Sequence, residues 1–105
     1  MAQRIQIDIS RERIAAFCRK WCVREFAVFG SVLREDFGPA SDVDVMVQFD
    51  PQAHRTLFDL VEMQDELREI FGREVDLLTR RGVEQSRNYI RKKEILSTAE
   101  VIYAA

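Results

Sequence analysis

The sequence predicts an α/β (α+β) domain in which a small mixed β-sheet of about four strands packs against helices. Three observations carry this prediction. Segments with helical and strand-like patterns alternate along the chain. Hydrophobic residues make up 47% and charged residues 32% of the sequence, a balance typical of globular domains. The length of 105 residues suits one core and not two. We therefore expect residues 1–105 to form a single domain.

The first half of the chain predicts one long helix and two strands. Arg11–Cys22 carries an apolar stripe at helical spacing behind a candidate N-cap, Ser10. Glu25–Phe29 is rich in aromatic and β-branched residues, as expected for a short buried strand. Val32–Phe37 has room for one or two helical turns. Asp42–Phe49 alternates strictly, which predicts a strand with one valine-rich buried face and one acidic outer face.

The second half predicts two further helices and two further strands. Thr56–Phe71 has helical spacing and stops at Gly72, while Glu74–Thr79 has the pattern of a strand. A third helix is expected within Val83–Leu96, and a last short strand at Val101–Tyr103. The apolar face of the second helix is expected to consist of Leu57, Leu60, Val61, Gln64, Leu67 and Phe71. The phenylalanines expected in the core are Phe26, Phe29, Phe49, Phe58 and Phe71.

Composition and charge exclude several functional classes. No apolar run approaches the roughly 20 residues that span a bilayer. The N-terminal residues also lack the apolar core of a signal peptide, so we expect a cytoplasmic protein that does not contact membranes. The net charge of −2 and the pI of about 5.4 argue against direct nucleic-acid binding. A basic cluster in the C-terminal third is either a local binding surface or a solvated helix face: Arg80, Arg81, Arg87, Arg91, Lys92 and Lys93.

Cys18 and Cys22 are four residues apart in the predicted first helix. They could form a thiol pair or half of a metal site, but His54 is the only histidine and no second Cys/His cluster would complete such a site. We expect instead that both act as small apolar side chains on a buried helix face.

One block of the sequence has a spacing typical of phosphate and metal chemistry. Gly30 and Ser31 are followed, ten residues later, by Asp42 and Asp44. Because side chains alternate along a strand, both carboxylates project from one face, and paired carboxylates suit Mg²⁺. Gly30 allows the backbone to approach a ligand closely. Ser31 offers a hydroxyl and a backbone N–H at the start of a helical turn, where phosphate is favoured.

Two further residues fit the same chemistry. Arg34, one turn after the Gly-Ser pair, could add a charged contact to phosphate. Asp76 interrupts the apolar run of its strand and would converge with Asp42 and Asp44 if the two strands lay side by side with matching faces. Neighbouring carboxylates raise one another's pKa, so such a cluster favours two divalent cations. Two cations form the usual clamp for in-line displacement at phosphorus.

The block Phe29–Asp44 resembles the Gly-Ser-x10-Asp-x-Asp signature of the minimal nucleotidyltransferase (MNT) domains of the DNA-polymerase-β-like superfamily. The likeness continues through Leu57–Leu60, Arg73–Thr79 and Ala99–Ala105, and so covers nearly the whole chain. It implies a stand-alone MNT protein with the nucleotidyltransferase fold.

This resemblance also implies a reaction and a role for each motif residue. An acceptor hydroxyl would attack the α-phosphate of ATP, AMP would be transferred and pyrophosphate would leave. The nucleotide-binding residues would be Gly30, Ser31, Arg34 and Ser41. The catalytic residues, which would also bind two Mg²⁺ ions, would be Asp42, Asp44 and Asp76. Asp76 would in addition help to deprotonate the attacking hydroxyl.

Chains of this size are similar to antitoxins that work beside helical HEPN ribonuclease toxins, so the resemblance implies a tyrosine of such a toxin as the acceptor. Two alternatives stay open. The chain could neutralise its partner by covering it, without catalysis, through its basic helix and through exposed methionines at Met46 and Met63. It could also transfer a nucleotide to a small molecule such as an aminoglycoside.

Overall fold

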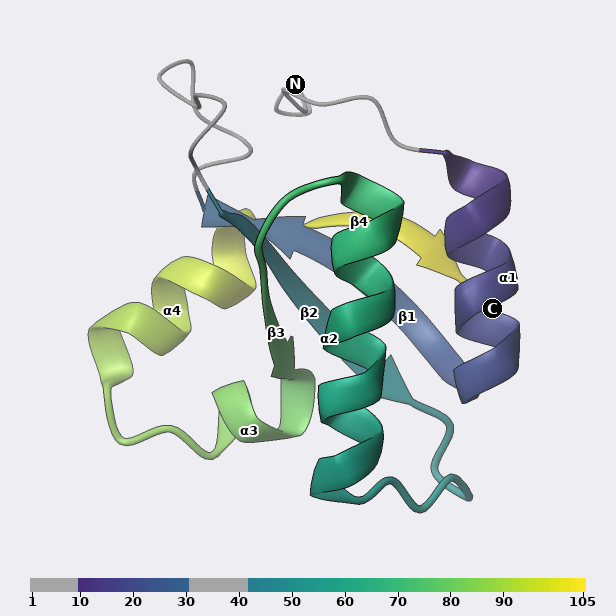
Figure 1. Ribbon diagram of the computed structural model, residues 1–105. Helices are drawn as coiled ribbons and strands as arrows, with labels where there is room; N and C mark the ends of the chain where they lie inside the picture. Colours follow the sequence, from purple (N-terminus) through teal and green to yellow (C-terminus); the bar gives the residue numbers. More distant parts are fainter. Residues whose placement is uncertain (1–9, 31–41) are drawn as a thin grey trace.

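The expected four-stranded mixed sheet with packed helices is confirmed (Figure 1). The computed structural model describes residues 10–30 and 42–105, and the expected helical turns within Val32–Phe37 lie outside these ranges. Along the chain the elements are α1 (Arg11–Trp21), β1 (Val23–Phe29), β2 (Val43–Phe49), α2 (Leu57–Phe71), β3 (Val75–Thr79), α3 (Arg80–Glu84), α4 (Tyr89–Thr98) and β4 (Glu100–Ala104).

The strands lie in the order β3-β2-β1-β4. β1 pairs antiparallel with both β2 and β4, whereas β2 and β3 run parallel. A parallel pair needs a long crossover, and α2 provides it. As a result β2 and β3 begin at the same end of the sheet, next to the point where β1 ends (Figure 1).

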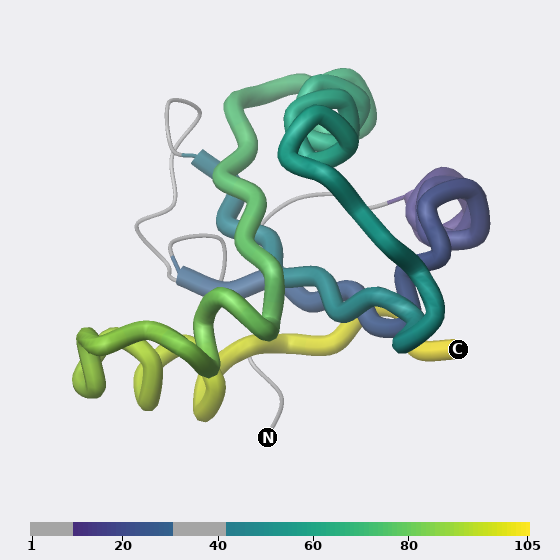
Figure 2. Tube along the Cα trace, turned by 90° about the horizontal axis from the view of Figure 1, so that it is seen from below, coloured from purple at the N-terminus to yellow at the C-terminus, as the bar shows by residue number. Residues whose placement is uncertain are grey.

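Helices cover both faces of the sheet, with α1 and α2 on one side and α3 and α4 on the other (Figure 2). The larger core lies under α1 and α2, and its fully buried side chains include Phe17, Phe26, Met63 and Leu67. The smaller core under α3 and α4 consists of Ala27, Phe29, Met46, Val83 and Ile95. Alternate residues of β1 and β2 therefore enter different cores.

Local sequence signals set the ends of the two long helices. The Ser10 hydroxyl accepts a backbone N–H of the first turn of α1, and Thr56 and Asp59 form a reciprocal capping box at the start of α2. Both helices end at a residue in the left-handed region, Cys22 with φ 59° and Gly72 with φ 69°. These caps agree with the expected boundaries to within about one residue.

The helix expected within Val83–Leu96 is present as α4, which spans Tyr89–Thr98, but the short helix α3 that precedes it was not expected. Thr79 caps α3, which has only five residues. The Asn88 side chain then accepts the backbone N–H of Arg91 and starts α4. Such side-chain oxygens compete with the helix for backbone donors. Apolar periodicity does not register this competition.

The buried face of α2 also differs from the expected one. Met63 and Leu67 are fully buried, whereas Leu57, Phe58 and Val61 are 76%, 84% and 58% exposed. The prediction that Phe58 is a core residue is therefore wrong. In Figure 1 the first turn of α2 lies beyond the ends of β2 and β3, where no strand covers it. The other four phenylalanines are buried or packed against a core: Phe26, Phe29, Phe49 and Phe71.

Met46 and Met63 were expected to be exposed, and both are buried, with 5% and 0% of their surface exposed. Met46 enters the smaller core and Met63 the larger one. The outer face of β2 is accordingly not open along its whole length, because α3 and α4 cover it at Met46. Neither methionine is available as a surface contact for a partner.

The two cysteines lie in different environments. Cys18 is fully buried, as expected, but Cys22 is exposed because it forms the C-cap of α1. The expectation of two buried thiols is therefore wrong for Cys22. Burial raises the pKa of the Cys18 thiol to about 12, although the nearby Arg19 charge acts in the opposite direction.

None of the helices within residues 10–30 and 42–105 combines the length and the apolar character that crossing a bilayer requires.

We predict that Cys22 alone reacts quickly with a thiol reagent such as DTNB in the folded protein. With a pKa of about 12, only about 10⁻⁴ of Cys18 is thiolate at pH 8, and its side chain is shielded. Both thiols should react in denaturant. The variant Cys22→Ser should lose the fast phase, and a fast phase that persisted in this variant would contradict the burial of Cys18.

A second prediction tests which face of α2 is buried. Met63→Ala should lower the free energy of unfolding by about 2–5 kcal/mol, because it leaves a cavity in the larger core. Val61→Ala, on the exposed face, should change it by less than about 1 kcal/mol. Urea denaturation of the two variants and the wild type measures both values. A larger loss of unfolding free energy in Val61→Ala than in Met63→Ala would indicate that the face predicted from the apolar spacing is the buried one.

Candidate functional site

The parallel pairing of β2 and β3 brings together two of the predicted acidic residues. Asp44 on β2 is the register partner of Asp76 on β3. Two positions further along each strand, Met46 and Leu78 contribute to the smaller core under α3 and α4. Because side chains two apart share a face, Asp44 and Asp76 project from that same face. They occupy its beginning, before the part that α3 and α4 cover.

Asp42 lies one residue before β2 and is exposed. The backbone N–H of Val43 donates to the carbonyl oxygen of Glu74 at 3.0 Å, which holds the start of β2 against the residue before β3. Asp42 therefore lies at the same end of the sheet as the Asp44–Asp76 pair. All three predicted carboxylates belong to one end of two adjacent strands.

Gly30 approaches this site from β1. Phe29, the last residue of β1, is the register partner of Asp44, so the following residue lies beside the Asp44 carboxylate. Gly30 has φ 73°, and a Cβ at this position would overlap Asp44 Oδ2. The backbone conformation and the available space both require glycine. The group that lies against Gly30 in the structure is the Asp44 side chain, and the approach of a ligand to Gly30 stays a prediction.

A pocket of about 170 Å³ opens at this point between the sheet and α4. Its lining residues are Phe29, Gly30, Asp44, Arg91, Glu94, Ile95 and Thr98. Sequence reasoning did not anticipate that α4 forms a wall of the site. The available signal was the spacing of Arg91, Glu94 and Thr98, which places three polar side chains along one stripe of a helix.

The donor chemistry of the site fits a divalent cation, since carboxylate oxygens are the ligands that Mg²⁺ prefers. The strand register also fits, because it places Asp44 beside Asp76. The present side-chain positions do not gather a binding centre: within the described residues, no three acidic, cysteine or histidine side chains lie close enough together to hold a metal ion. The backbone thus provides the arrangement, and the side chains would have to turn toward a common ion.

Three of the predicted nucleotide-binding residues, Ser31, Arg34 and Ser41, lie outside the described residues. Of the predicted site residues, the structure therefore describes Gly30, Asp42, Asp44 and Asp76. Gly30 is the last described residue before the segment that contains Ser31.

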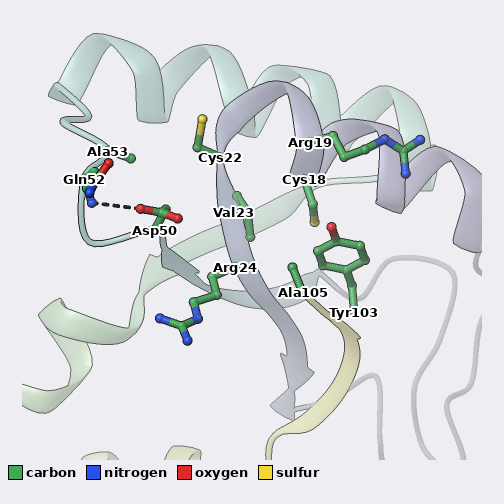
Figure 3. Close-up of a pocket in the computed structure, with 10 residues that line it drawn as sticks. All are labelled: Cys18, Arg19, Cys22, Val23, Arg24, Asp50, Gln52, Ala53, Tyr103 and Ala105. Carbon is green, nitrogen blue, oxygen red and sulfur yellow. Dashed lines mark hydrogen bonds between the residues drawn. The ribbon is translucent and has the colours of Figure 1, made fainter.

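A wider pocket, of about 710 Å³, lies at the opposite end of β1 (Figure 3). Its lining includes Cys18, Cys22 and two basic residues, Arg19 and Arg24, which point in different directions. The Asp50 carboxylate there accepts the backbone N–H of Gln52 at 2.9 Å. None of the described motif residues, Gly30, Asp42, Asp44 and Asp76, lines this pocket, so it is a weaker candidate for phosphate chemistry.

Residues 11–98 match the family model of the nucleotidyltransferase domain. Two similar proteins of Methanocaldococcus jannaschii are each named "putative protein adenylyltransferase". MJ0435 is 35% identical over 75 residues, which are 71% of this chain and 78% of the relative. MJ1379 is 33% identical over 85 residues, which are 81% of this chain and 83% of the relative.

Solved structures show the same fold. The structure of a "putative minimal nucleotidyltransferase" is 30% identical, with a TM-score of 0.64 and 86% of each chain covered. A toxin–antitoxin structure with AMP-PNP reaches a TM-score of 0.71 at 16% identity, covering 92% of this chain and 75% of that chain. A complex of a tri-AMPylated Shewanella oneidensis HEPN toxin with an MNT antitoxin reaches 0.60 at 15%, covering 90% and 70%. Because the family model matches residues 11–98 and the two M. jannaschii relatives are more than 30% identical, the chain belongs to the nucleotidyltransferase domain family.

Proposed function

We propose that this nucleotidyltransferase transfers AMP from ATP to a hydroxyl of a partner protein, that the acceptor is a tyrosine of a HEPN-type ribonuclease toxin, and that the chain thereby acts as an antitoxin in the cytoplasm. The observation that carries the proposal is the Asp44–Asp76 register pair beside Gly30. The names of the M. jannaschii relatives support adenylyl transfer to protein. The structures with AMP-PNP and with an AMPylated HEPN toxin support the nucleotide and the partner.

The proposed mechanism assigns a separate task to each side of the site. Gly30, with Ser31, Arg34 and Ser41, would hold the triphosphate beside β1. Two Mg²⁺ ions bound by Asp42, Asp44 and Asp76 would neutralise charge on the phosphates and lower the pKa of the attacking hydroxyl.

We assign to Asp76 the task of acting on the acceptor. It is exposed and lies on β3, which is an edge strand, so an acceptor hydroxyl can reach it from the open side of the sheet. Asp76 would accept the hydroxyl proton as the oxygen attacks the α-phosphorus. The bond to the bridging oxygen then breaks and pyrophosphate leaves with the electron pair.

The first test of this function uses ATP labelled at the α-phosphate. With Mg²⁺ and the HEPN-type protein as acceptor, the wild type should transfer label to that protein. The double variant Asp42→Asn/Asp44→Asn should lower the rate at least about 100-fold, because it removes the charges that hold the cations. Asp50→Asn, at the opposite end of β2, is the matched control and should retain activity.

Two results together would contradict a catalytic role. The acceptor would stay unlabelled, and the double asparagine variant would protect cells as well as the wild type does. Neutralisation by covering the partner would then explain protection, although the burial of Met46 and Met63 removes two of the contacts expected for that mode. Labelling of small hydroxyl compounds without labelling of protein would indicate a small-molecule acceptor.

A further prediction compares two glycines that both have positive φ. Gly30→Ala and Gly72→Ala should each destabilise the fold by about 1–2 kcal/mol, because alanine is strained in the left-handed region. Only Gly30→Ala should lower the transfer rate, by at least about tenfold, since its Cβ would displace the Asp44 carboxylate. Nothing lies within 4 Å of a Cβ at Gly72. Equal losses of activity in the two variants would indicate a general effect of instability.

A further inference from the structure

The basic cluster of the C-terminal third is not a uniform surface. Arg80 is engaged in ion pairs, at 3.8 Å to Glu25 and 3.6 Å to Glu84. Of the six basic residues, Arg91 alone lines the pocket that contains Gly30 and Asp44. The structure thus selects one cation of the cluster as a neighbour of the candidate site.

Arg91 lies in the first turn of α4, and its orientation is set by the backbone. The Asn88 side chain accepts the Arg91 backbone N–H at 3.1 Å and fixes the start of the helix. The side chain is exposed, and no ion pair among residues 10–30 and 42–105 holds its guanidinium. Arg91 and Asp44 line the same pocket, together with Glu94 of α4.

Arg91 also lines a second pocket, of about 360 Å³, along the edge of β3. The walls of this pocket are mostly apolar and include Leu78, Val83 and Ile95. Lys92 lines this second pocket but not the first, and Lys93 lines neither. Arg91 thus stands where a small polar pocket next to Asp44 meets a larger apolar one.

We propose that Arg91 contacts the polyphosphate of the bound nucleotide and holds it against the carboxylate edge of the sheet. This inference rests on the proposed function. A triphosphate that lies beside three carboxylates needs cationic partners besides the metal ions, because like charges that are close together and partly desolvated repel strongly. A guanidinium suits this task, since it presents paired donors to two phosphate oxygens at once.

The placement favours phosphate over the nucleoside as the group that Arg91 contacts. The pocket shared by Arg91 and Asp44 is small, and four of its seven lining residues are polar or charged, whereas the walls of the neighbouring pocket are mostly apolar. Phosphates that bind in this pocket beside Asp44 would also lie near Arg91, because both residues line it.

The test compares three consecutive residues of one helix: Arg91→Ala, Lys92→Ala and Lys93→Ala each remove one positive charge. Calorimetric titration with AMP-PNP and with inorganic tripolyphosphate, each with Mg²⁺, measures nucleotide and phosphate affinity without turnover. Arg91→Ala should weaken both ligands by roughly tenfold or more. Lys92→Ala and Lys93→Ala should leave both within about twofold of wild type, since neither residue lines the Asp44 pocket. Arg91→Lys, which keeps the charge but loses the paired donors, should fall between wild type and Arg91→Ala.

Two outcomes would overturn the inference while leaving the proposed function in place. In the first, Arg91→Ala binds AMP-PNP and tripolyphosphate as tightly as the wild type. In the second, Lys93→Ala loses as much affinity as Arg91→Ala, which would show that only the net charge of α4 matters. If the wild type itself does not bind AMP-PNP with Mg²⁺, the proposed function fails and this inference with it. Urea denaturation of each variant verifies that the fold is retained.

Discussion

The site depends on the register in which β2 and β3 pair. Val43, Val45 and Val47 are completely buried in the larger core, so β2 cannot slip by one residue without turning its valines out and its aspartate into that core. The hydrophobic alternation of one strand thereby decides the face from which Asp44 emerges. The parallel pairing then decides that Asp76 emerges beside it. The packing of the valines in the larger core therefore also determines where Asp44 and Asp76 lie.

The face of the sheet that α3 and α4 cover has two parts. Under these helices, its side chains belong to the smaller core, which contains Met46 and Ile95. Where these helices end, the same face carries carboxylates. Asp44 and Asp76 are register partners on adjacent strands, and their place at the open end of the face is consistent with a binding role. A stabilising role would not need them there.

How much of this arrangement could be predicted from the sequence depends on how far apart along the chain the interacting residues lie. The period of two in β2 and the spacing from Gly30 to Asp44 are local, and both are visible in the sequence. The pairing of Asp76 with Asp44 is not local. It was expected only on the condition that the two strands be neighbours, and the structure meets that condition.

The errors have the same origin. Apolar spacing in α2 indicated Val61 and Phe58 as buried, but which side of a helix is covered depends on where the sheet ends beneath it. The break between α3 and α4 depends on Thr79 and Asn88, whose side chains cap helices in a way that periodicity does not detect. The roles of Ser31, Arg34 and Ser41 remain predictions of the sequence motif.

The break between α3 and α4 also determines which basic residue faces the site. Consecutive residues of a helix point about 100° apart, so of Arg91, Lys92 and Lys93 only one can face the Asp44 pocket directly. Asn88 fixes the first turn of α4 and with it the rotation of the helix. A single continuous helix starting near Val83 would lack this cap, and its rotation about the helix axis would not be set by Asn88. A capping side chain that looks purely structural therefore helps to select the basic residue that lines the pocket with Asp44, and this is why a run of basic residues yields one candidate contact.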